Sequence, residues 1–209
     1  MIAAVWASGA RLRDAVLTRL WQLRGRTALH ALGVKGAHGV TYYGMPVVSR
    51  VAGSSIELGP RVVLCSHPRF TALGVARPVV LRTLNASASI CIGADVGISG
   101  GVICAAMSVR IGDRCLLGAD VQITDTDFHA LAPANRRFEK RPESIASAPV
   151  VIEDNVFLGA GVRVLKGVRI GRNSVVGAGS VVTRDIPSDV IAAGVPARVI
   201  RQLPNEQGN

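Results

Sequence analysis

The residues whose types and spacing best suit chemistry are a histidine and two nearby carboxylates. Asp125 and Asp127 shortly precede His129 in the segment Thr-Asp-Thr-Asp-Phe-His. An imidazole titrates near neutral pH and can take a proton from a hydroxyl, and a neighbouring carboxylate can fix its tautomer and raise its basicity. Two alternatives stay open. The carboxylates either orient His129 or end the preceding strand, and His129 is either a general base or an ordinary surface histidine.

A second group, the arginines and lysines, is concentrated at the two ends of the chain. The formal net charge is +10, from 24 Lys and Arg against 14 Asp and Glu. Residues 1–40 and 163–201 each carry +5, whereas residues 41–162 hold 11 basic and 10 acidic side chains. Arginines favour phosphate groups as partners. Aromatic residues, which stack on bases, are only 4% of the chain, so nucleic acid is not an expected partner.

The cysteines and the absence of other motifs exclude several chemistries. No Cys-x-x-Cys pair and no His cluster accompanies them, so we expect no metal site. Scattered thiols without a secretory signal predict small buried hydrophobic residues in a cytoplasmic protein. There is no Gly-x-Ser-x-Gly motif, and no cysteine has a clear histidine partner nearby in sequence, which favours direct transfer over a covalent enzyme intermediate. The cysteines concerned are Cys65, Cys91, Cys104 and Cys115.

The elements that must position these side chains form a repeat with a period of six. Aliphatic residues recur in this step at Ile152, Leu158, Val164, Ile170, Val176 and Val182. The same phase appears upstream at Ile92, Ile98 and Cys104, and again at Ile111, Leu117 and Ile123. A strand alternates with a period of two, so a period of six indicates a short strand plus a corner. Three such sides close a triangular coil with the small aliphatic residues stacked inside.

Breaks in this repeat predict where loops leave the coil. One extra residue separates Cys104 from Ile111, and the step from Ile123 to Ile152 is 29 residues rather than 6. The excess is polar and contains prolines, so residues 124–147 must project as a loop with His129 at its root. We expect a helical, basic segment at 1–40, a coil domain at 41–201 and a polar tail at 202–209.

The units resemble the hexapeptide-repeat proteins. Residues 177–187, Gly-Ala-Gly-Ser-Val-Val-Thr-Arg-Asp-Ile-Pro, and 192–200, Ala-Ala-Gly-Val-Pro-Ala-Arg-Val-Ile, resemble the galactoside, maltose and capsular-polysaccharide O-acetyltransferases. The resemblance covers roughly residues 85–203. It implies an all-β solenoid, a left-handed parallel β-helix of about five coils, with an N-terminal helix and a short C-terminal helix after Pro196.

The resemblance also implies a reaction and a donor. It implies transfer of acetyl from acetyl-CoA to a hydroxyl of a sugar or surface polysaccharide, or its precursor, with His129 as general base. Ala160 and Ala178 would offer backbone hydrogen bonds to the pantetheine of CoA. The residues that would surround its nucleotide are Thr183, Arg184, Arg198 and Arg201.

On the acceptor side the sequence departs from the galactoside pattern. Those enzymes carry an asparagine about one and a half coils before the histidine, and Ser99 stands near that place here. Ser99 and Asn85 are the candidates for acceptor binding. The departure implies different acceptor contacts or oxyanion stabilisation, and a backbone N–H near Gly100 is an alternative oxyanion donor.

The family places its active sites between subunits, so the resemblance implies a homotrimer with three composite sites. Rival functions are N-acetylation of an amino sugar nucleotide, O-acetylation of serine, and a structural β-helix subunit that binds no acetyl-CoA. A γ-type carbonic anhydrase would need three histidine ligands for zinc. His129 is the only histidine within the regular repeats, which excludes that function.

The first forty residues predict one long helix. Residues 3–32 lack proline and place Val5, Leu12, Val16, Leu20 and Leu23 on one face, with Trp6 and Trp21 on the apolar side. The helix either packs on the coil or a sister subunit, or lies on anionic lipid with its arginines outward. No run of 18 apolar residues exists, so we expect a cytoplasmic protein, at the inner face of the membrane if the second alternative holds.

Overall fold

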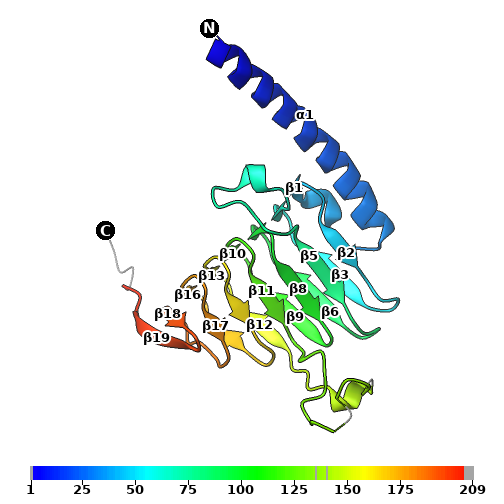
Figure 1. The fold of residues 1–209 in the computed structure, drawn as a ribbon, viewed down its shortest axis with the longest axis vertical. Helices are drawn as coiled ribbons and strands as arrows, with labels where there is room; N and C mark the ends of the chain where they lie inside the picture. Colours follow the sequence, from blue (N-terminus) through cyan, green and yellow to red (C-terminus); the bar gives the residue numbers. More distant parts are fainter. Residues whose placement is uncertain (1, 135, 140, 205–209) are drawn as a thin grey trace.

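Three sheets of short parallel strands form the body of the chain (Figure 1). The computed structural model describes residues 2–134, 136–139 and 141–204, and for residues 2–11 it describes the backbone alone. Within these residues the sheets hold eight, six and five strands. Every pairing is parallel except the last, between β18 and β19.

The strands are assigned to the sheets as follows. The eight-stranded sheet holds β1 (Thr41–Tyr43), β4 (Val63–Cys65), β7 (Gly97–Ser99), β10 (Leu116–Leu117), β13 (Phe157–Leu158), β16 (Val175–Val176), β18 (Val190–Gly194) and β19 (Ala197–Gln202). The six-stranded sheet holds β2 (Val47–Ser49), β5 (Val80–Thr83), β8 (Val102–Ala105), β11 (Gln122–Thr124), β14 (Arg163–Val164) and β17 (Val181–Val182). The five-stranded sheet holds β3 (Ser55–Leu58), β6 (Ser89–Ile92), β9 (Ser108–Ile111), β12 (Val150–Ile152) and β15 (Arg169–Ile170).

Consecutive strands visit the three sheets in turn, so the chain winds as a three-sided parallel coil. From β3 to β17 each set of three strands contributes one strand to each sheet. Strands β3 to β17 therefore make five full turns, and β1, β2 and β18 extend the stack at its two ends. The hydrogen bonds run between turns, and each inward side chain stacks on that of the next turn.

The inward ladder of the six-stranded sheet corrects one residue of the predicted repeat. Ile103, not Cys104, pairs with Ile123 and lies in the ladder. The corner before β8 is tighter than six residues require because Gly100 and Gly101 both adopt positive φ, 66° and 91°. A side chain at Gly101 would collide with the backbone of the next turn, so the corner depends on glycine.

A long helix closes one end of the coil. The helix α1 (Ile2–Ala31) leans over β1, with its N-terminus pointing away from the strands (Figure 1). Gly25 lies against the ring of Tyr42, where a Cβ would come within 2.7 Å of the ring, and Leu29 is buried in the core. Val5 and Trp6, predicted on its apolar face, lie outside the described side chains. Short 3₁₀ helices follow at η1 (Ala37–Gly39), η2 (Pro68–Phe70) and η3 (Pro142–Ser144).

The other end is closed by a strand, and the predicted short C-terminal helix is wrong. After Gly194 the chain reverses and β19 pairs antiparallel with β18. Without β19 the backbone of β18 would be an open edge, and the β-branched Val199 and Ile200 suit a strand better than a helix. Of the predicted tail, residues 205–209 lie outside the described residues. The division into segments 1–40, 41–201 and 202–209 stays a prediction.

No helix among the described residues is both long and apolar enough to cross a membrane.

The stacked aliphatic core predicts the cost of removing one of its members. Leu158 is fully buried between Leu117 and Val176 of the adjoining turns. Leu158→Ala should lower the free energy of unfolding by about 2–5 kcal/mol, because it leaves a cavity that rigid neighbours cannot fill. Leu131→Ala, at an exposed position, is the control and should change it by about 0.5 kcal/mol or less. Equal urea midpoints for the two variants would contradict the stacked core.

Candidate active site

His129 lies where the chain leaves the coil after β11. The long loop that follows returns to the coil at β12, and its two ends are tied together at the root. Thr126 and Ser147 form an antiparallel bridge and a hydroxyl–hydroxyl hydrogen bond of 2.9 Å. The N–H of Asp127 donates to the carbonyl of Ala146 at 3.0 Å. His129 is therefore held close to a rigid edge of the coil.

Asp125 is used as a structural tie between two turns. Its side chain is 0% exposed, and both carboxylate oxygens accept backbone hydrogen bonds from the turn above. The N–H of Ala106 donates at 2.6 Å and the N–H of Met107 at 2.7 Å. Both oxygens already have close partners, and no hydrogen bond joins Asp125 to His129 in the described residues. The arrangement favours the structural alternative for Asp125.

In Asp127 one carboxylate oxygen is hydrogen-bonded and the other has no hydrogen-bond partner among the described residues. Its Oδ1 accepts from the ammonium of Lys166 at 2.7 Å, whereas its Oδ2 is buried without a hydrogen-bond partner among the described residues. A buried carboxylate oxygen without a donor costs free energy, so this atom is suited to receive a proton donor from a ligand or an imidazole. Phe128, with φ of 62°, turns the chain between Asp127 and His129.

The imidazole of His129 is exposed and lines an open hollow in the loop. The hollow measures about 670 Å³ and is also lined by Pro133, Arg136, Arg137 and Phe138. Within the described residues, no hydrogen bond or ion pair engages the imidazole. The guanidinium of Arg137 lies 6.0 Å from the centre of the Phe138 ring, and that of Arg136 donates to the carbonyl of Leu131. The hollow thus combines a base, two cations and an aromatic ring.

The edge of the coil that carries His129 also carries several other predicted residues. Here the six-stranded sheet leads into the five-stranded one, and we call it the histidine edge, defined by Asn85, Asp125, Lys166 and Arg184. The side-chain amide of Asn85 donates to the carbonyl of Ala106 at 2.9 Å. Ala106 belongs to the turn of the coil that precedes the turn of Asp125. Thr183 and Arg184 follow β17, so they lie at the end of this edge that is nearest the C-terminus.

Ala160 and Ala178 lie on a different edge, where the eight-stranded sheet leads into the six-stranded one. We call it the alanine edge, defined by Ala119, Ala160 and Ala178. The corners stack closely: the N–H of Gly161 donates to Ala119 at 2.7 Å and that of Gly179 to Ala160 at 2.8 Å. Ser99, at the end of β7, belongs to this edge and not to that of His129.

The segment 66–78 covers the alanine edge and was not predicted as part of a site. Its backbone is held there because the N–H of Ala76 donates to both oxygens of Asp120, at 3.1 and 3.0 Å. Between them is a hollow of about 560 Å³ lined by Leu73, Ala160 and Gly161 among others. The signal available in the sequence was the step from Leu64 to Leu81, which departs from the six-residue period.

Arg198 and Arg201 project from the terminal strand β19 and are exposed. Arg198 pairs with Ala193, which stacks on Gly177 at the lower end of the alanine edge. Their guanidinium groups contact only carbonyls of their own strand and carry no ion pair to a described acid. Both remain free to bind an anion. One chain thus divides the predicted donor residues between two edges.

The geometry argues against one candidate oxyanion donor and against a nucleophilic role for three of the cysteines. The N–H of Gly100 donates to the carbonyl of Cys65 at 2.8 Å, so it is not free to serve as an oxyanion donor. Burial raises the pKa of the thiols of Cys104 and Cys115 to about 11, which keeps them protonated and unsuited to covalent catalysis. Burial also raises the pKa of Cys65. No group of three metal-binding side chains occurs among the described residues.

The tie made by Asp125 predicts a large loss of stability on its removal. Asp125→Ala should lower the free energy of unfolding by about 3 kcal/mol, because the buried N–H of Ala106 and the partly buried N–H of Met107 lose a charged acceptor. Asp127→Ala, which breaks one partly exposed ion pair and leaves no N–H group of the described backbone without its acceptor, should cost about 1 kcal/mol. Chemical denaturation of both variants measures the difference. A smaller loss for Asp125→Ala than for Asp127→Ala would contradict the structural role.

Part of the chain is similar to known repeat proteins. The model of the hexapeptide repeat of succinyl-transferase matches residues 108–123 and 149–184. The galactoside O-acetyltransferase of Escherichia coli is 45% identical over 96 residues, and that of Lactococcus lactis 50% identical over 95. These matches cover 46% of this chain but only 45% and 44% of the two relatives, so less than half of each relative is aligned.

A solved structure extends the comparison over most of the chain. PerB from Caulobacter crescentus, determined in complex with CoA and GDP-perosamine, superimposes with a TM-score of 0.50 and 26% sequence identity. The superposition covers 88% of this chain and 67% of PerB. The described coil is therefore shared by a protein that binds CoA.

Proposed function

We propose that this chain, a hexapeptide-repeat protein similar to the galactoside O-acetyltransferases, transfers acetyl from acetyl-CoA to a hydroxyl of a sugar or surface polysaccharide, or its precursor. The observation that carries the proposal is the position of His129. The ring is exposed, has no hydrogen-bond partner among the described residues and lines a hollow at the root of the loop. A base held in this way can reach an acceptor hydroxyl without first breaking a contact.

The proposed reaction is a direct transfer. His129 takes the proton of the acceptor hydroxyl as its oxygen attacks the thioester carbon. The new acetyl–oxygen bond forms, the acetyl–sulfur bond breaks, and the imidazolium returns the proton to the departing thiolate. Asp127, held by Lys166, would stabilise the imidazolium through its free Oδ2. Burial raises the pKa of the thiols of Cys65, Cys104 and Cys115, which disfavours these three as alternative nucleophiles.

For the acyl donor we propose the alanine edge and the terminal hairpin. Coenzyme A carries a long pantetheine arm that accepts and donates hydrogen bonds, and phosphates that favour guanidinium groups. The backbone at Ala160 and Ala178 would serve the first, and Arg198 and Arg201 the second. Thr183 and Arg184, on the histidine edge, would reach the nucleotide only from a neighbouring subunit or around the lower end of the coil.

A homotrimer would bring the two edges together. Leu116, Phe157, Val175 and Ile191 lie side by side in register on the outer surface of the eight-stranded sheet, where Leu116 and Phe157 are exposed. Such an apolar stripe on a flat sheet is suited to packing against another subunit. We propose threefold assembly in which the histidine edge of one subunit meets the alanine edge of the next. The resemblance to the family supports the same arrangement.

We also propose a handedness for the coil and a cellular location for the protein. The coil would be left-handed, as in the hexapeptide-repeat fold that the comparisons match. The protein would act in the cytoplasm, which agrees with four cysteines that are all free in the described structure.

A second candidate is N-acetylation of an amino sugar nucleotide. The observation that favours it is the superposition on PerB, whose crystals held CoA together with GDP-perosamine. Assay of acetyl-CoA with simple sugars, amino sugar nucleotides and serine separates the alternatives by the acceptor that releases free thiol.

The proposed base predicts a selective loss of turnover. His129→Ala should lower kcat by a factor of about 10²–10⁴, the usual contribution of a general base, and leave the Kd for CoA unchanged. Thiol release measures the first and calorimetry the second. His38→Ala, which removes a histidine distant from the loop, is the matched control. Unchanged turnover in His129→Ala would refute the proposed mechanism. If the wild-type protein does not bind CoA at all, the proposed function is refuted and a structural subunit is the remaining alternative.

The proposed phosphate contacts predict a selective loss of donor affinity. The double variant R198Q and R201Q should raise the Kd for CoA about tenfold or more, because charged hydrogen bonds to phosphate are lost. R110Q, on the outer surface of the five-stranded sheet, should leave the Kd unchanged. Titration by calorimetry measures all three proteins. Equal affinities would place the donor site elsewhere.

A further inference from the structure

We propose that the outer surface of helix α1 docks on an anionic lipid membrane. This surface is a stripe of four apolar residues, Leu12, Val16, Leu20 and Leu23, which we call the outer stripe. Their exposed fractions are 69%, 50%, 51% and 65%. The spacing of four, four and three residues puts them on one side of the helix. Four large aliphatic side chains in one row are an unpartnered patch rather than scattered surface residues.

The opposite side of the same helix is already occupied by the coil. The ring of Trp21 lies 5.2 Å from that of His67 and 5.6 Å from that of Phe70. The side-chain amide of Gln22 donates to the carbonyl of Tyr42 at 3.0 Å, and Leu29 is 1% exposed. The helix is therefore fixed on one side and free on the other. The outer stripe is not the surface through which the helix packs on the coil.

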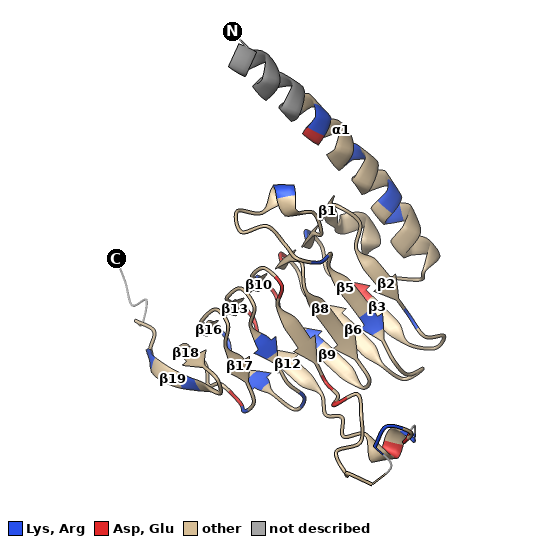
Figure 2. Cartoon of the chain, in the orientation of Figure 1, with Lys and Arg blue, Asp and Glu red and all other residues tan. Residues whose placement is uncertain are grey.

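Arginines flank the outer stripe. At 100° per residue, Arg19 and Arg26 fall on one side of the stripe and Arg24 on the other. All three are exposed, and none has an ion-pair partner among the described side chains. Figure 2 shows that basic residues are distributed along α1. An apolar row between cationic side chains is the arrangement of a helix that lies in a membrane interface.

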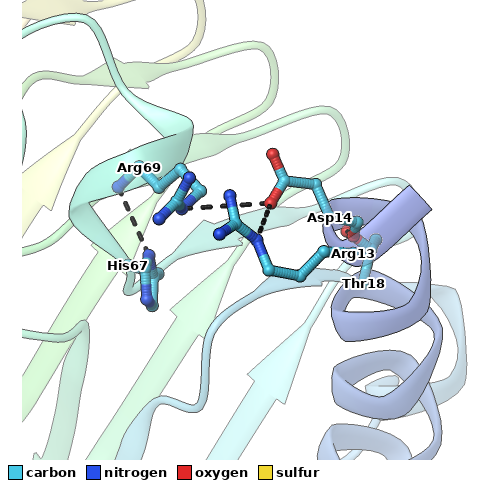
Figure 3. Close-up of polar contacts among 5 residues, drawn as sticks. All are labelled: Arg13, Asp14, Thr18, His67 and Arg69. Carbon is cyan, nitrogen blue, oxygen red and sulfur yellow. Dashed lines mark hydrogen bonds and ion pairs between the residues drawn. The ribbon is translucent and has the colours of Figure 1, made fainter. Parts of the chain in front are cut away.

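The one acidic residue of the helix is turned away from this surface. Figure 3 shows the carboxylate of Asp14 joined by dashed lines to Arg13 and to Arg69, which comes from the 3₁₀ helix η2 beside α1. The carboxylate lies 3.4 Å from the guanidinium of Arg13 and 3.9 Å from that of Arg69. No acid therefore reaches the outer stripe from the described part of the helix.

Charge decides between a membrane and a second copy of the chain. Two copies packed through their outer stripes would bring Arg19, Arg24 and Arg26 of each near those of the other, without an acid to neutralise them. An anionic lipid surface supplies the opposite charge to the arginines and an apolar layer to the leucines. The helix would lie in the plane of the surface, with the coil beside the membrane. A polymer or precursor anchored there would be brought to the coil.

The test is binding of the full-length protein to vesicles. We compare the wild type, L20E/L23E and V47E/V51E on vesicles of phosphatidylcholine with and without phosphatidylglycerol, by co-sedimentation. Val47 and Val51 are exposed apolar residues of the coil, so the third protein is matched in charge and in residue number. Wild type and V47E/V51E should bind the anionic vesicles, and L20E/L23E should bind about tenfold less or not at all.

Further measurements separate the alternatives. Binding should weaken as salt is raised and in R19Q/R24Q/R26Q, because the arginines meet lipid phosphates. Thermal unfolding shows whether each variant is folded, and light scattering after size exclusion gives its oligomeric state. Equal binding of wild type and L20E/L23E would overturn the proposal. So would loss of the oligomer in L20E/L23E, which would make the outer stripe an interface between subunits. None of these results depends on acetyl transfer, so the proposed function stands or falls separately.

Discussion

The molecule depends on the stacking of short parallel strands in register, turn upon turn. Each strand contributes one inward aliphatic side chain, such as Leu117, Leu158 or Val176, that lies directly over its counterpart in the next turn. Since the hydrogen bonds join different turns, no turn is stable alone, and the stack behaves as one body. The small, branched core side chains explain how a chain with 4% aromatic residues can fold at all.

This stacking also creates the candidate site. Corners of successive turns line up into edges, so residues 18 or more positions apart in sequence become neighbours, as Asp127 and Lys166 do. A loop that leaves one edge, such as the loop of His129, is held at its base by the stacked turns. The stack of turns also has two ends, and these are covered by α1 and by the β18–β19 hairpin. The helix then presents its remaining surface outward, where an apolar row flanked by arginines is free to meet a partner.

Much of the fold could be predicted from the sequence because a strict period in apolar residues has few structural explanations. The period predicted the three-sided winding and the loop that carries His129. It misplaced Cys104 because two glycines shortened a corner, a change that no periodic pattern signals. The resemblance implied a helix where β19 forms. The strand forms instead because the edge of β18 needs a hydrogen-bonding partner, and that edge exists only in the folded sheet.

The sequence by itself determined the repeat, the position of the break at His129 and the basic character of both ends, since each is a property of residues close together in the chain. Only the tertiary structure decided which carboxylate is a tie and which has a free oxygen. Asp125 meets Ala106 and Asp127 meets Lys166 only after the turns have stacked. The tertiary structure likewise separated Ser99 from the edge of His129 and turned Leu20 and Leu23 outward. Contacts between distant residues follow from the number of residues in each corner, which the period alone does not specify.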